Sequence, residues 1–160
     1  MAYDYETLGI EYDKGVLTAT INNPPVNVMT QPLYLDLVGF TSEVEKDESV
    51  KVVVFQSADP DFFIAHFDVE AILEFAIDTP AEKSMEFSDF HLMCERVRTM
   101  PKATIVKMAG RAGGGGNEFA SSCTKIPLDL NRLKFSFPFW YTSSQYGSVS
   151  DGKSISGLTT

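Results

Sequence analysis

Residues 103–120 read ATIVKMAGRAGGGGNEFA, an apolar run that is followed by glycines and then by a helix-forming segment. The run 103–108 predicts a buried strand, and residues 117–120 predict the start of a helix. Glycines let the backbone adopt positive φ and let a ligand approach closely, while helix N-terminal N–H groups stabilise a developing oxyanion or a phosphate. Neither phosphate-binding pattern fits, since the glycines end in no GKS or GKT and match no GxGxxG register.

A second candidate turn follows the β-branched run 50–56. Residues 62–69 read FFIAHFDV, and a tight turn at the carboxyl end of a strand leaves backbone N–H groups free. Asp68 can cap the helix that follows, as in any ordinary strand-to-helix turn. Glu118, two residues after the last glycine, either caps its helix or acts as a general acid/base. Two N–H donors from the exit turns of two parallel strands could converge on one oxygen and form an oxyanion hole, with a carboxylate nearby to move a proton.

The chain before residue 124 alternates strands and helices. The turn signal Asp13-Lys14-Gly15 predicts a hairpin, and Thr30 is a candidate N-cap. The predicted elements are, in chain order, strands 8–12 and 16–21, helix 31–46, strand 50–56, helix 68–77, a helix that begins at Thr79-Pro80 and ends near Met100, strand 103–108 and a helix from 117. Strands that alternate with helices predict parallel crossovers and an α/β layer fold.

Composition sets limits on function. The chain has 160 residues, the size of one domain, and its formal charge of −9 argues against a nucleic-acid-binding surface. Its two cysteines predict reduced thiols rather than a disulfide framework. His66 and His91 are isolated, and no ligand-spaced cluster indicates a metal site. No run is apolar enough to span a bilayer and no signal peptide is evident, so we expect a cytoplasmic protein that does not bind membranes.

The composition changes near residue 119. Residues 1–118 carry nine Lys or Arg against 20 Asp or Glu, whereas residues 119–160 carry a net charge of +2 and end in a stretch of mostly Ser, Gly and Thr. This break divides the chain into two regions of different character.

Four segments, in order and at family spacing, resemble the crotonase superfamily, that is, the enoyl-CoA hydratase/isomerase family. They are GVLTATINNPPVN (15–27), FIAHFDV (63–69), PKATIV (101–106) and GRAGGGGNEFA (110–120). The resemblance runs from about residue 8 to residue 123. It implies an α/β fold of the ClpP/crotonase type, a layered β-β-α spiral, with a core over residues 1–123 and a divergent tail over residues 124–160.

The resemblance also implies a site. The substrate would be an acyl-CoA thioester, whose carbonyl oxygen the backbone N–H groups of Phe67 and Gly115 would hold as an enolate forms. Glu118 would be the first of the family's two acid/base carboxylates. Coenzyme A would enter as part of the substrate, with no covalently bound cofactor and no metal. The residues expected to contact it are Ala65, His66, Asp68 and Gly114.

Two departures from the family pattern matter. His66 stands where the family has glycine, which predicts either a strained turn or a surface position. The segment KFSFPF (134–139) resembles the family's second-carboxylate segment as far as Pro138, but Phe139 stands where the glutamate would be, and a phenyl ring cannot transfer a proton. We also expect the family's C-terminal helices to be missing, as in a truncated chain with a frameshifted or alternatively spliced tail.

Three functions stay open at this point. The first is an enzyme of fatty acid metabolism, either a hydratase, which is a lyase, or an isomerase, weakened by the loss of one carboxylate. The second is a non-catalytic module that binds acyl-CoA or a protein partner. The third is an inactive truncated product that exposes apolar surface. The family forms trimers, which suggests a homo-oligomer, although the helices that contribute to the trimer have no counterpart.

Overall fold

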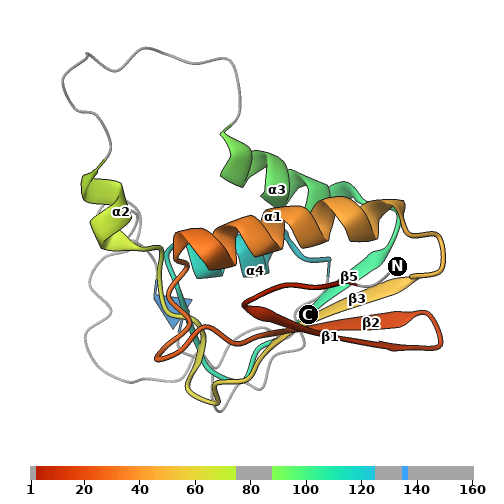
Figure 1. The fold of residues 1–160 in the computed structure, drawn as a ribbon, viewed down its shortest axis with the longest axis horizontal. Helices are drawn as coiled ribbons and strands as arrows, with labels where there is room; N and C mark the ends of the chain where they lie inside the picture. Colours follow the sequence, from red (N-terminus) through yellow and green to blue (C-terminus); the bar gives the residue numbers. More distant parts are fainter. Residues whose placement is uncertain (1–2, 75–87, 125–134, 137–160) are drawn as a thin grey trace, which may run out of the picture.

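The computed structural model describes residues 3–74, 88–124 and 135–136. Its larger sheet has the order β1-β2-β3-β5, formed by β1 (Leu8–Asp13), β2 (Val16–Ile21), β3 (Val52–Ser57) and β5 (Ala103–Lys107). β1 and β2 form the predicted antiparallel hairpin. β2 pairs with β3, and β3 with β5, in parallel, so the predicted parallel crossovers are confirmed (Figure 1).

A second, smaller sheet was not predicted. It has the order β4-β6-β7, formed by β4 (Phe62–Ile64), β6 (Arg111–Gly113) and β7 (Phe135–Ser136), all paired in parallel. The chain leaves β3 through a loop and enters β4, and it leaves β5 and enters β6 in the same way. The two candidate turns therefore follow β4 and β6 of the smaller sheet. The sequence had predicted that they follow the strands that are now β3 and β5 of the larger sheet. Phe139 and residues 125–134 lie outside the described residues.

Three helices, α1 (Gln31–Lys46), α3 (Asp89–Thr99) and α4 (Gly115–Ser122), lie on one face of the larger sheet (Figure 1). α1 (Gln31–Lys46) has the predicted bounds, and its buried positions include Leu33, Leu37, Phe40 and Val44. Thr30 is the N-cap residue, as expected, but its side chain caps nothing. The centre of the core is aromatic: the ring of Phe55 lies 5.8 Å from that of Phe40 and 5.0 Å from that of Phe119. Phe40 belongs to α1, Phe55 to β3 and Phe119 to α4 (Gly115–Ser122), so the three rings connect α1 and α4 through the sheet.

The helix that ends near Met100 starts later than predicted. α3 (Asp89–Thr99) begins after Ser88, whose hydroxyl accepts a hydrogen bond from the N–H of His91. The expected start at Thr79-Pro80 lies outside the described residues, and α3 itself is shorter than the predicted helix. Its end before Pro101 is as predicted.

The glycine run is not the open loop that the sequence suggested. Gly113 ends β6, while Gly115 and Gly116 already belong to α4, two residues before the predicted helix start. Gly114 has φ +47°, a conformation that favours glycine. A Cβ on Gly116 would lie 2.6 Å from both the Cβ and the carbonyl oxygen of Ile64. Glycine at position 116 therefore lets α4 pack directly on β4.

Candidate functional site

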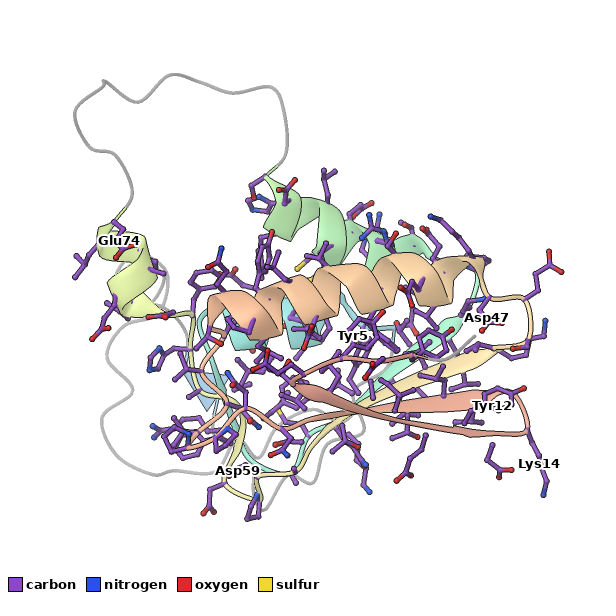
Figure 2. The ribbon with its side chains drawn as sticks, viewed as in Figure 1. Tyr5, Tyr12, Lys14, Asp47, Asp59 and Glu74 are labelled. Atoms are coloured by element: carbon purple, nitrogen blue, oxygen red, sulfur yellow. The ribbon has the colours of Figure 1, made fainter. Side chains whose placement is uncertain are left out.

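A pocket of about 670 Å³ opens where β4 and β6 end and the helices begin. α2 (Val69–Leu73) forms one side of it and stands apart from the larger sheet, with Glu74 at its far end (Figure 2). The lining residues are Tyr34, His66, Phe67, Val69, Ile72, Ser88, Asp89, Phe90, Gly114, Gly115 and Glu118. The pocket therefore joins the two candidate turns to the first turns of the helices.

Phe67 and Gly115, the two expected oxyanion donors, are neighbours in this pocket. A Cβ on Gly115 would lie 3.5 Å from Cδ2 of Phe67. Residues 66–68 pair in parallel with Met29, whose N–H donates to the His66 oxygen (2.8 Å) and whose oxygen accepts from Asp68 (3.2 Å). In a parallel pair the intervening N–H, that of Phe67, points away from this partner.

Neither amide is used elsewhere in the part of the chain that the structure describes. No backbone or side-chain acceptor engages the N–H of Phe67 or of Gly115 there. Gly115 is the first residue of α4, and the first N–H groups of a helix have no acceptor within it. Both donors are thus available to a ligand.

Glu118 does not cap its helix, so that interpretation was wrong. The N-cap of α4 is Gly114, whose carbonyl oxygen accepts from the N–H groups of Asn117 (2.9 Å) and Glu118 (3.1 Å). The Glu118 side chain is exposed and lines the pocket. Among the described residues, no hydrogen bond or ion pair engages its carboxylate, which leaves it open to a substrate.

The four residues expected to contact coenzyme A divide into two pairs. His66 and Gly114 line the pocket, whereas Ala65 and Asp68 are not among its lining residues. Asp68 caps α2, its Oδ1 accepting from the N–H groups of Glu70 (3.0 Å) and Ala71 (3.4 Å), as predicted. The coenzyme A contacts themselves stay predictions.

His66 occupies a surface position, and the expectation of a strained turn is wrong. The residue is exposed, and it is not among the described residues with positive φ. Its Nδ1 lies 2.6 Å from the carbonyl oxygen of Phe67. Because a carbonyl only accepts, Nδ1 carries the proton and Nε2 is left unprotonated in the neutral ring.

The sequence missed six of the lining residues: Tyr34, Val69, Ile72, Ser88, Asp89 and Phe90. Three of the lining aromatic rings form a continuous wall, since Phe67 lies edge-on to Tyr34 (6.2 Å) and to Phe90 (6.4 Å). Burial and, to a lesser degree, the Asp89 carboxylate raise the pKa of Tyr34. Their position could have indicated them, because the six missed residues lie in or next to the first turns of helices that follow or flank the strand exits.

The first turns of three helices reach the pocket: α1, α3 and α4 line it through Tyr34, Asp89 and Gly115. Helix N-termini carry partial positive charge, whereas the charged side chains in the described lining are the carboxylates of Asp89 and Glu118. Within the described ranges, no group of three or more His, Cys, Asp or Glu could hold a metal ion.

A family model described as enoyl-CoA hydratase/isomerase matches residues 11–153. The chain belongs to the enoyl-CoA hydratase/isomerase family. The matched range continues past residue 123, where we expect the tail to begin, and that boundary stays a prediction.

Individual relatives agree with the family assignment. The chain is 29% identical over 124 residues to the fatty acid oxidation complex subunit alpha of Aliivibrio fischeri, which covers 76% of this chain and 18% of that protein. It is 26% identical over 116 residues to a "probable enoyl-CoA hydratase" of Bacillus subtilis, covering 72% of this chain and 44% of that one. The chain thus spans less than half the length of both relatives.

Solved structures confirm the predicted crotonase-type α/β fold. The structure of a "putative enoyl-CoA hydratase" from Streptomyces avermitilis has a TM-score of 0.70 and 34% identity, covering 84% of this chain and 50% of that one. No helix of the described part has both the length and the apolar character needed to cross a membrane.

Proposed function

We propose that this chain binds an acyl-CoA thioester and moves a proton at the α-carbon, next to the thioester carbonyl. The N–H groups of Phe67 and Gly115 hold the carbonyl oxygen, and Glu118 takes up or delivers the proton. The observation that carries the proposal is that these three residues line one pocket, with Phe67 in contact with Gly115.

The chemistry follows from where the charge develops. Removal of the α-proton places negative charge on the thioester oxygen, and preorganised N–H donors stabilise that charge most effectively where water is excluded. The wall formed by Tyr34, Phe67 and Phe90 is apolar, so it suits an acyl chain and lowers the local dielectric. The Glu118 carboxylate is unengaged among the described residues and can serve as the base.

Coenzyme A enters this proposal as part of the substrate. His66 and Gly114 lie on the pocket wall and are the residues that would touch it, with Ala65 and Asp68 in the same turn as His66. Family membership supports the acyl-CoA class, and a soluble cytoplasmic protein of fatty acid metabolism fits that class. A homo-oligomer is part of the same proposal.

The test is deuterium exchange at the α-carbon of butyryl-CoA in D2O, followed by mass spectrometry, with the full chain. The wild type should catalyse exchange, and Glu118→Gln should slow it by about 10²–10⁴-fold while calorimetry still detects butyryl-CoA binding. Glu11→Gln, an exposed position on β1, is the matched control and should exchange like the wild type.

Two other outcomes would refute the proposal and choose between the alternatives. Binding of butyryl-CoA without exchange by the wild type would favour a non-catalytic acyl-CoA-binding module. Neither binding nor exchange would favour an inactive product.

A further inference from the structure

His66 brings to the pocket an imidazole ring that the proton transfer at the α-carbon does not use. The residue stands where the family has glycine, so this ring is a feature of the present chain rather than of the family pattern. It is exposed and lines the pocket. Its Nδ1 donates to the carbonyl oxygen of Phe67 (2.6 Å), which leaves a free lone pair on Nε2. Among the described residues, no hydrogen bond or ion pair engages Nε2.

The pairing of residues 66–68 with Met29 places the ring on the same side as the N–H of Phe67. The His66 carbonyl and the Asp68 N–H both bond to Met29. In a parallel pair the N–H and the carbonyl of the residue between them point together to the opposite side. The Phe67 carbonyl therefore faces the same way as the Phe67 N–H. Because the His66 ring is bonded to that carbonyl, it lies on the side where the proposed function places the thioester oxygen.

The hydrogen bond to Phe67 prepares the imidazole to act as a base. A histidine base has one ring nitrogen held by an acceptor, which fixes the ring and its tautomer, and the other nitrogen unprotonated. His66 meets both conditions. Since the side chain is exposed, water reaches Nε2. A water molecule there stands beside the amides that hold the thioester oxygen, and the carbonyl carbon is bonded to that oxygen.

We propose that His66 is the general base of a second reaction in this pocket, the hydrolysis of an acyl-CoA thioester to a carboxylic acid and free CoA. The inference rests on the proposed function for its substrate class and for the two amides that bind the carbonyl oxygen. It goes beyond that function because the bond between the acyl carbon and sulfur is broken.

The steps balance with water as the only co-reactant. Nε2 of His66 takes one proton from water as the water oxygen forms its bond to the carbonyl carbon. One electron pair of the carbonyl double bond moves to its oxygen, which the N–H groups of Phe67 and Gly115 hold. The carbonyl then re-forms, the carbon–sulfur bond breaks, and the sulfur leaves with the electron pair of that bond. The sulfur takes the proton from Nε2, so the imidazole is neutral again at the end of the turnover.

The test follows two reactions of the full chain on one substrate, butyryl-CoA. Liquid chromatography measures the release of free CoA, and mass spectrometry measures α-proton exchange in D2O. The wild type should release CoA faster than buffer alone. His66→Gln should slow release by about 10²–10⁴-fold and should lower the ratio of release to exchange by at least about 30-fold, a split that follows from the same range.

Two further variants separate a base from a structural role. His66→Gly, which restores the family's residue, should regain part of the release rate when imidazole is added, beyond the rate that imidazole gives without protein. His91→Gln is the matched control, because His91 is the other histidine of the chain, is exposed and is not among the lining residues of the pocket. It should keep the wild-type ratio of release to exchange.

The remaining outcomes distinguish this inference from the proposed function. Exchange without CoA release by the wild type would overturn the hydrolysis and leave the proposed function standing. Release by His66→Gln within about threefold of the wild type, equal loss of both reactions in that variant, or failure of imidazole to restore His66→Gly would overturn the role of His66. Release without exchange by the wild type would refute the proton transfer and leave the hydrolysis standing. Absence of both reactions would remove both.

Discussion

Replacement of Gly116 by alanine tests how the two turns are held together. The new Cβ would lie 2.6 Å from the Ile64 carbonyl oxygen and 2.8 Å from its Cγ2. Rotation of a side chain cannot relieve a contact with a backbone oxygen, so α4 must move away from β4. Overpacking of this kind costs about 1–3 kcal/mol, and the better helix propensity of alanine returns about 1 kcal/mol. With the strain near its upper value, we expect a net loss of about 2 kcal/mol.

Gly115→Ala is the matched control for this substitution. Its Cβ would meet Phe67 at 3.5 Å, an ordinary contact, and its φ is not positive. Its stability should stay level or rise by up to about 1 kcal/mol. Thermal unfolding followed by circular dichroism should show Gly116→Ala melting roughly 4–8 °C below the wild type and Gly115→Ala melting at or above it. Equal melting temperatures for the two variants would refute the close packing of α4 on β4.

Three further predictions concern stability and reactivity. Asp68→Ala should cost about 1 kcal/mol through loss of the α2 cap, as measured by urea denaturation, and an unchanged midpoint would contradict the capping geometry. Hydrogen bonds from Ser49, then from Tyr3, lower the pKa of Asp47 (Figure 2) to about 2. Because the pKa is lower in the folded state, the ionised Asp47 stabilises the fold above about pH 4, and this stabilisation is lost toward about pH 2. Asp47→Asn should therefore flatten the pH dependence of the melting temperature in that window. Burial raises the pKa of the Cys123 thiol to about 12, so iodoacetamide at pH 8 should label it only after denaturation, and rapid native labelling would show that the thiol is accessible.

Local pattern was enough to predict the hairpin and α1. The apolar spacing of Leu33, Leu37, Phe40 and Val44 is a complete helical signal within one segment, and those residues are all buried. The short strands β4 and β6 carry no such signal, because three residues show no period. They exist because each pairs with a partner distant in the sequence, which no local pattern reveals.

The glycine run shows why the site was only partly predictable. Glycine usually marks a loop, but Gly115 and Gly116 lie in a helix, and glycine is needed at position 116 because Ile64 leaves no room for a Cβ there. Phe67, Gly115 and Glu118 line one pocket, and the roles that the family resemblance implies for them stay predictions. Asp89, at the start of α3, was missed because its place in the lining of the pocket follows only from how the helices pack.

The most direct test of the account is a crystal structure of the full chain with butyryl-CoA bound. We expect the thioester carbonyl oxygen to lie about 2.7–3.1 Å from the backbone nitrogens of both Phe67 and Gly115, with the α-carbon next to the Glu118 carboxylate. A carbonyl oxygen that reaches only one of the two nitrogens, or a thioester bound outside the pocket, would contradict it.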